Sequence, residues 1–281
     1  INNGATGSLT IDTSTMLMTY TPQQNVCGNN DIILIEVCDI YNCDTAIIDY
    51  TIACPPFYNI NQIDATNSVG VANFADVTCE ISGTVYGIDY RGGSGYSFTL
   101  IDGTGGINVF SFDDVNGYTV TEGDFINIFG TTTQFNGLLE MVPDSIVLSG
   151  TNSINQPTIV TMLDETTESE FVKIETFTLV DMAQWTNAGS GFNVDVRNTT
   201  DTLTVRIDAD CDLFGTPAPA GWFNVTGLGG QYDSSNPYTS GYQLFPCNQG
   251  DIELLTNTNE PKNLSGQIKL FPNPTNGLLN I

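Results

Sequence analysis

The sequence predicts an all-β protein. Short runs of Val, Ile, Thr, Phe and Tyr recur along the 281 residues, and Gly, Asn and Asp separate them. This pattern is typical of antiparallel strands joined by turns. Helix signals are nearly absent, and the strongest of them, at 166–175, ends in β-branched residues that favour a strand. The length suits two or three small domains rather than one large core.

The first 55 residues contain strand-like runs at 8–12, 31–39 and 46–54. The Thr-Tyr-Thr-Pro stretch at 19–22, followed by an Asp-rich hairpin, resembles the C-terminal part of a bacterial immunoglobulin- or cadherin-like repeat. The resemblance implies a partial β-sandwich over 1–55, which we expect strands upstream of Ile1 to complete. Without such strands a sheet edge stays open, and self-association through this edge is expected.

Residues 77–150 form the second predicted unit. A long first run contains Gly83, and a glycine inside a strand indicates a bend or bulge. A hairpin turns at Asp102-Gly103, and two further runs end the unit. Five strands with a curved first strand resemble an OB-fold β-barrel, which implies a fold and no particular function.

Residues 169–255 repeat this plan weakly and are similar to a second OB-like five-stranded barrel. A first run begins at 171, a hairpin turns around 198–201, and two runs follow it. Segments 56–76 and 151–168 are predicted to be linkers. Segment 256–281 is predicted to be a linker that leads to a truncated sorting signal.

The last eleven residues read Phe-Pro-Asn-Pro-Thr-Asn-Gly-Leu-Leu-Asn-Ile. Pro-Asn-Pro is stiff and extended, and Asn-Gly forms a tight turn before an apolar run. The string resembles the start of the type A C-terminal sorting domain of Bacteroidota type IX secretion cargo, with Phe271 in place of the usual tyrosine. The resemblance implies an extracellular or outer-surface location and contact with the secretion machinery. The residues that carry it are Pro272, Asn273, Pro274, Asn276 and Gly277.

Composition restricts the function. The chain has 32 Asp and Glu, 6 Lys and Arg and no His, for a net charge of −26. This balance predicts that nucleic acid and anionic membranes are not partners, and it favours a cation or a neutral glycan. No apolar run is long enough for a transmembrane segment. Without histidine, Ser-His-Asp and Cys-His machinery cannot be built, so we expect no enzyme and assign no catalytic residue.

Seven cysteines in an exported chain indicate disulfides. Cys38 and Cys43 are close enough to bridge a hairpin. Cys211–Cys247 would tie the third segment, and Cys54–Cys79 would join two domains. Cys27 is then left over, and Cys27–Cys54 is an alternative.

Two sets of side chains are candidate binding sites. Asp208, Asp210 and Asp212 alternate, so on a strand three carboxylates would share one face and could hold calcium, the only cofactor we consider. The alternative is a solvated strand end. The ligand-binding candidates are Tyr86, Tyr90, Arg91 and Tyr96, in the runs where OB-folds stack ligands, and the alternative is ordinary barrel packing.

Three Asp-Ser/Thr-apolar triplets match the O-glycosylation pattern of Bacteroidota. Their acceptor residues are Thr45, Ser145 and Thr202. About two such triplets are expected by chance in a chain of this composition. The pattern alone is therefore weak support for modification.

These features together favour a secreted, non-catalytic surface protein, an adhesin or a structural component of an extracellular layer or fibre. One alternative is the accessory binding region of a larger secreted hydrolase or nuclease. Another is a calcium-dependent glycan-binding module.

Overall fold

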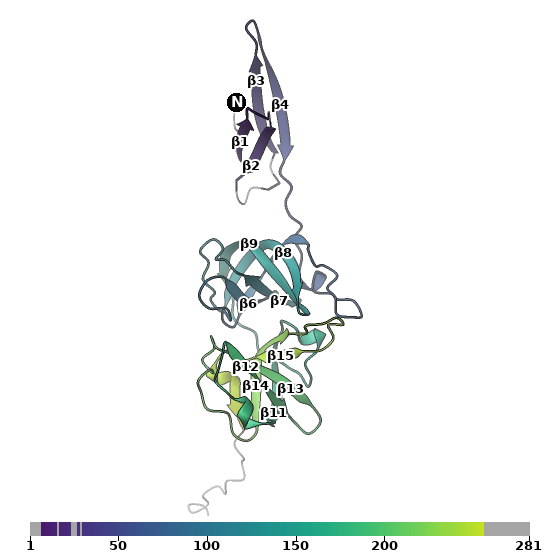
Figure 1. The fold of residues 1–281 in the computed structure, drawn as a ribbon, viewed down its shortest axis with the longest axis vertical. Coiled ribbons are helices and arrows are strands. Elements are labelled where there is room, and N and C mark those ends of the chain that lie inside the picture. The colour runs from purple at the N-terminus through teal and green to yellow at the C-terminus, as the bar shows by residue number, and fades with distance from the viewer. Residues whose placement is uncertain (1–6, 16, 24–26, 29, 256–281) are drawn as a thin grey trace, which may run out of the picture.

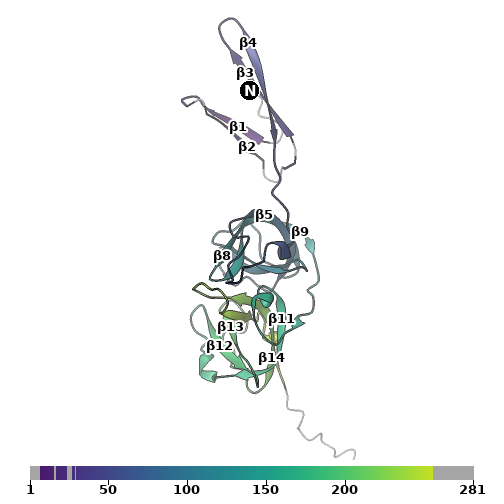
Figure 2. The same cartoon turned by 90° about the vertical axis from the view of Figure 1, so that its right-hand side faces the viewer.

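The computed structural model describes residues 7–15, 17–23, 27–28 and 30–255. Two N-terminal hairpins are followed by two barrels that lie one after the other along the long axis (Figures 1 and 2). The predicted all-β class with OB-like barrels is confirmed. Helices in the described part are single 3-10 turns, and none has the length or apolar character needed to cross a bilayer.

The N-terminal unit consists of two antiparallel hairpins in separate sheets. Strands β1 (Gly7–Asp12) and β2 (Leu17–Pro22) form one hairpin, and β3 (Asn30–Cys38) and β4 (Cys43–Thr51) form the other. Tyr20 links them, because its ring stacks on Tyr50 at 4.9 Å between centroids and its hydroxyl donates to the Asp31 carboxylate at 2.5 Å.

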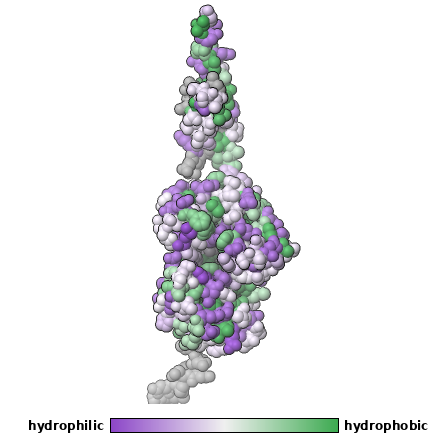
Figure 3. Space-filling view, in the orientation of Figure 1, coloured by the Kyte–Doolittle hydropathy of each residue, from purple (hydrophilic) through white to green (hydrophobic). Residues whose placement is uncertain are grey.

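The hairpins bury little apolar surface. Ile33 is fully buried, whereas large apolar side chains elsewhere in the unit are exposed, as Figure 3 shows at the tip of the β3–β4 hairpin. These exposed side chains include Leu17, Ile32, Val37, Ile40, Tyr41 and Ile47. The two hairpins lie in separate sheets and lack the interior of a complete sandwich, so the partial sandwich over 1–55 stays a prediction.

The first barrel is a closed five-stranded sheet in the order β5-β6-β7-β9-β8. Only the β7–β9 pair is parallel, which is the topology of an OB-fold. Its strands are β5 (Thr78–Tyr86), β6 (Tyr96–Ile101), β7 (Gly106–Ser111), β8 (Asp124–Phe135) and β9 (Leu138–Thr151).

The predicted linker 56–76 is part of this barrel, so that prediction is wrong. Turn η1 (Ile60–Gln62) places Ile60 in the core, and Ile63 and Ala72 join the same cluster. The backbone N–H of Ile60 also donates to the Asp102 carboxylate at 2.8 Å. Burial of these apolar side chains holds segment 56–76 against the first barrel, although the segment has no strand pattern of its own.

The second barrel repeats the order as β11-β12-β13-β15-β14, and a β11–β14 pairing closes it. Its strands are β11 (Phe171–Leu179), β12 (Gly191–Arg197), β13 (Thr202–Asp208), β14 (Phe223–Gln231) and β15 (Tyr242–Phe245). The flanking elements are β10 (Thr158–Ile159), η2 (Glu165–Thr167), η3 (Met182–Gln184), η4 (Gln249–Asp251) and β16 (Ile252–Leu254).

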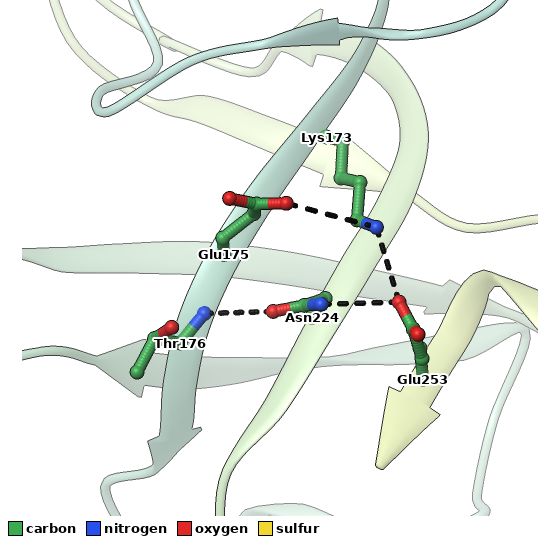
Figure 4. Close-up of polar contacts among 5 residues, drawn as sticks. All are labelled: Lys173, Glu175, Thr176, Asn224 and Glu253. Atoms are coloured by element: carbon green, nitrogen blue, oxygen red, sulfur yellow. Dashed lines mark hydrogen bonds and ion pairs between the residues drawn. The ribbon is translucent and has the colours of Figure 1, made fainter. Parts of the chain in front are cut away.

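A polar cluster fastens β16 to this barrel (Figure 4). Glu253 on β16 accepts from the Lys173 ammonium and from the Asn224 side-chain amide, both at 3.0 Å. The Asn224 carbonyl oxygen accepts from the backbone N–H of Thr176 at 2.9 Å, where β11 bulges. One amide thus joins the bulge to the last strand.

The two barrels pack closely against each other. A Cβ on Gly106 of β7 would lie 1.9 Å from the carbonyl oxygen of Ser169, so only glycine fits there. Tyr86 packs on Phe171 with 5.6 Å between ring centroids. The Tyr90 hydroxyl lies 2.6 Å from Cys247 Sγ. We call this contact region the seam.

The cysteine predictions are partly right. Cys38–Cys43 is confirmed, and Cys27 pairs with Cys54, which was the alternative. Cys54–Cys79 is therefore wrong, because Cys79 is fully buried as a free thiol in the first core. Cys211–Cys247 is not formed either, since both residues are buried free thiols in this structure.

Counting the free thiols of the protein tests which cysteines are paired. Burial raises the pKa of the Cys247 thiol to about 12 and also raises the pKa values of Cys79 and Cys211. Because only the thiolate is reactive, we expect no reaction with a disulfide reagent in the native state, and three thiols per chain in denaturant. A single thiol in denaturant would instead show that two of these three cysteines are joined.

Candidate functional site

A cavity of about 630 Å³ lies at the seam, and both barrels line it. The first barrel contributes side chains of β6, β7 and β9 and the end of β8. The second contributes β12, β13, β14 and β15. The polar lining residues are Ser97, Thr99, Asn108, Glu140, Ser169, Ser190, Asn193, Arg206, Asp208, Gln231 and Gln243, together with the Tyr90 and Tyr232 hydroxyls.

Strand alternation explains why polar groups face the cavity. On β6, Phe98 and Leu100 point into the barrel core, so Ser97 and Thr99 point outward. On β13, Val205 and Ile207 are buried, and Arg206 and Asp208 point outward. The second and third strands of both barrels therefore turn their outer faces toward one shared space, and these are the surfaces that OB-folds commonly use for ligands.

Glu140 is the most enclosed carboxyl in the cavity wall. Its side chain is 6% exposed and accepts from the Asn108 side-chain amide at 3.0 Å. Burial raises the pKa of Glu140 to about 7, and the Asn108 hydrogen bond opposes this shift. The neutral form of this carboxyl is thus favoured over a wider pH range than it is in water.

Arg206 is the basic side chain in the lining. Its guanidinium donates to the Ser190 carbonyl oxygen at 3.1 Å and to Asn193 Oδ1 at 3.4 Å. The nearest Asp208 oxygen lies 3.8 Å away, and burial raises the pKa of Asp208. The contacts hold the guanidinium at the cavity wall without neutralising it fully.

A second guanidinium lies beside the cavity. Arg91 lies over Phe110, which lines the cavity, at 5.4 Å from the ring centroid, and over Phe112 at 4.7 Å. Two of the six basic residues of this acidic chain therefore lie at or beside one cavity. The local charge here differs from the average of the chain.

Gln231 contributes a buried acceptor. Its side chain is 4% exposed, and its amide nitrogen donates to the carbonyl oxygens of Tyr238 and Ser240 at 3.2 and 2.9 Å. Its Oε1 has no hydrogen-bond partner among the described residues. Nearby, Phe135 and Tyr232 form an edge-on aromatic pair, and both side chains are 57% exposed. The cavity thus combines buried acceptors with an exposed aromatic rim.

Glu168 lies at the seam and takes its backbone donor from the first barrel, the Leu139 N–H at 3.1 Å. Burial raises the pKa of Glu168 to about 8, and the carboxylates of Glu165, Asp64 and Glu140 raise it further. Its second oxygen is buried and has no partner within the described part of the chain. Both Glu140 and Glu168 are therefore held more readily as neutral acids than in water.

The predicted ligand-binding set does not form one surface. Tyr96 lies in the first barrel core and donates to the carbonyl oxygens of Val115 and Tyr118, and Tyr86 is buried at the seam. Of the four residues, Tyr90 lines the cavity and Arg91 lies beside it. The interpretation as barrel packing holds for the other two.

The three aspartates of the predicted metal site do not lie along one face of a strand. β13 ends at Asp208, whose carboxylate accepts from the Asp210 N–H at 3.0 Å, so 208–212 form a turn rather than a strand. Asp208, Asp210 and Asp212 do not converge as one set of metal ligands. Within the described ranges the grouped ligand atoms belong to Glu36, Cys38 and Cys43, and both cysteines are in a disulfide.

The predicted glycosylation residues differ in their exposure, and the predicted sorting residues are not among the described residues. Thr45 and Thr202 are exposed, whereas Ser145 is 9% exposed and accepts from the Asn116 side chain, which disfavours its glycosylation. The sorting residues Pro272, Asn273, Pro274, Asn276 and Gly277 lie outside the described residues.

No protein-family model matches the chain. A curated relative, endonuclease YhcR of Bacillus subtilis, is 27% identical over 187 residues, which cover 63% of this chain and 15% of that protein. The chain thus matches a small part of a much longer protein. Similar solved structures include the tetrameric p202 HIN2 domain (9% identity, TM-score 0.30, 61% of this chain and 88% of that one). Another is the Ifi202 HINa domain with 20-bp double-stranded DNA (13% identity, TM-score 0.25, 48% and 78%).

The prediction that nucleic acid is excluded as a partner is contradicted, because the curated relative that matches part of this chain is named an endonuclease. Net charge is an average over the chain and does not describe a local surface such as the one around Arg91 and Arg206. The exclusion is therefore withdrawn.

The buried acids predict a pH dependence of stability. Their pKa values are raised in the folded state from 4.5 to about 7 for Glu140 and about 8 for Glu168, so folding favours the protonated forms. Their contribution to the free energy of unfolding is therefore fully present below about pH 4.5. It is lost as the pH rises toward 8. At about 1.4 kcal/mol per pKa unit, the loss is on the order of 3 kcal/mol for Glu140 and on the order of 5 kcal/mol for Glu168 at most.

Thermal unfolding between pH 5 and 8 tests this effect. We expect the melting temperature to fall across this range, and to fall less in Glu140→Gln and Glu168→Gln. The exposed Asp144→Asn on β9 is the matched control for general charge repulsion. An equal slope in all four proteins would contradict the role of the buried acids.

Proposed function

We propose that residues 56–255 form a non-catalytic module that binds single-stranded nucleic acid in the cavity between its barrels, as an accessory region of a larger secreted hydrolase or nuclease. The cavity itself carries this proposal: aromatic side chains and two arginines meet where two OB-type faces oppose each other. The match to part of an endonuclease supports it.

The side-chain chemistry favours a single strand over a duplex. Bases of a single strand stack on aromatic side chains, and such stacking contributes about 1–3 kcal/mol per base. Phe110, Phe135, Tyr232 and Phe245 line the cavity and are available for this role. Duplex binding depends on many phosphate contacts, and two arginines supply few.

We assign the module no catalytic role. The chain has no histidine, and the Glu140 carboxyl is held by Asn108 inside the cavity wall. A secreted location remains a proposal as well. The Cys27–Cys54 and Cys38–Cys43 disulfides support it, because disulfides persist in oxidising compartments.

A second candidate is the adhesin or structural role, which the N-terminal hairpins favour. Their exposed apolar side chains, such as Ile40 at 88% and Ile47 at 68%, suit an interface with another protein surface. Light scattering that finds only monomers over a wide concentration range would remove the support for this role. The calcium-dependent glycan alternative has less support, because its three aspartates do not converge.

Binding to a labelled oligonucleotide of about 12 nucleotides, followed by fluorescence anisotropy, tests the proposal. We expect the single strand to bind more tightly than the duplex of the same sequence. Arg206→Ala should weaken binding roughly 5- to 10-fold, and two phosphate contacts should give a log–log salt slope of about −1.4.

Arg197→Ala on β12 is the control, because Arg197 is exposed and does not line the cavity. It should leave the affinity close to that of the unaltered protein. Absence of single-strand binding, or an equal loss in both arginine variants, would overturn the proposed function.

A further inference from the structure

We propose that the cavity takes up a proton at Glu140 when it binds a single strand, so that the affinity for nucleic acid rises as the pH falls through neutrality. This inference rests on the proposed binding of a single strand and adds how that binding is regulated. It follows from the position of an enclosed carboxyl in the wall of a cavity that receives an anion.

The fold places the Glu140 side chain in the cavity wall. Leu139 and Met141, its neighbours on β9, pack in the core of the first barrel, so strand alternation points Glu140 outward toward the seam. On the paired strand β7, the Asn108 side-chain amide donates to the Glu140 carboxylate at 3.0 Å. The side chain is 6% exposed, so an ionised carboxylate here has a neutral donor and little water to stabilise its charge.

The charged groups that surround Glu140 do not compensate its charge. Strands β7 and β8, which pair with β9, place no charged side chain in the described lining. On β13, the Arg206 guanidinium has its ion-pair contact with Asp208, at 3.8 Å. The segment before β11 brings Glu168, a further acid, whose pKa the Glu140 carboxylate helps to raise. The other titratable groups of the described lining are hydroxyls, those of Tyr90 and Tyr232.

A phosphodiester in the cavity would share this space with the carboxyl. Two negative charges repel each other more strongly in a region of low dielectric constant than in water. Burial already raises the pKa of Glu140 to about 7, and a bound anion raises it further. Because the pKa is higher in the bound state, the affinity is fully present below the pKa of the free protein. The affinity is lost as the pH rises above that value.

Anisotropy titrations of the full chain with labelled oligo-dT, at constant ionic strength, test this linkage. Thymine bases and phosphodiesters keep one charge state between about pH 6 and pH 8, so a change in affinity reports on the protein. We expect the affinity to fall roughly 5- to 10-fold over this range, as a single acid with a pKa near 7 predicts. Glu140→Gln should bind at the higher pH about as tightly as the unaltered protein binds at the lower one.

Asp144→Asn is the matched control, because Asp144 lies on the same strand and its exposed side chain is outside the cavity. It removes one negative charge and should keep the full fall in affinity with pH. Circular dichroism at each pH shows that the proteins compared are folded. If Glu140→Gln does not fold, calorimetry of the unaltered protein in two buffers measures the same proton, and we expect an uptake of a few tenths of a proton per strand near pH 7.

The outcomes separate the inference from the proposed function. Equal affinities at the two pH values, binding without proton uptake, or a fall that persists unchanged in Glu140→Gln would overturn the inference and leave the proposed function intact. Absence of binding at every pH would overturn both.

Discussion

The close approach of Gly106 to the Ser169 carbonyl determines how the two barrels meet. Any side chain at Gly106 would overlap that carbonyl, so β7 of the first barrel lies directly against the start of the second. The other seam contacts follow from this approach. Tyr90 reaches Cys247, Tyr86 reaches Phe171, and the Leu139 N–H reaches Glu168.

The same contact creates the electrostatic character of the site. Glu140 lines the cavity at the seam and Glu168 accepts from the other barrel, and burial raises the pKa values of both acids. Two acids with raised pKa values, and an amide oxygen that has no partner among the described residues, then lie near two of the few arginines in the chain. An acidic protein thereby acquires a cavity whose local chemistry differs from that of its surface.

Much of the fold could be predicted, because strand runs and turn residues are local signals. The Asp102-Gly103 turn and the repeated five-run plan indicate both barrels correctly. The sequence does not predict that segment 56–76 joins the barrel, because Ile60, Ile63 and Ala72 become core residues only when the barrel closes around them.

The site could be predicted only in part. The expectation that the first two strands of the OB-like unit carry ligand-binding side chains places Tyr90 and Arg91 at or beside the cavity correctly, whereas Tyr96 faces inward once the barrel closes. Asp208 was placed in an extended run, but its carboxylate binds the Asp210 N–H and ends the strand. Glu140 and Gln231 give no local signal, since their importance comes from contact between segments far apart in the chain.

The opposed barrel faces also limit stoichiometry. Two OB units in a row usually offer two surfaces along which one strand can run, and linked sites then gain affinity through high effective concentration. Here β6 and β7 face β12 and β13 across a single space, so a strand bound as proposed would contact both barrels at once. The proposal then implies one bound segment per chain, and avidity would require several copies of the protein.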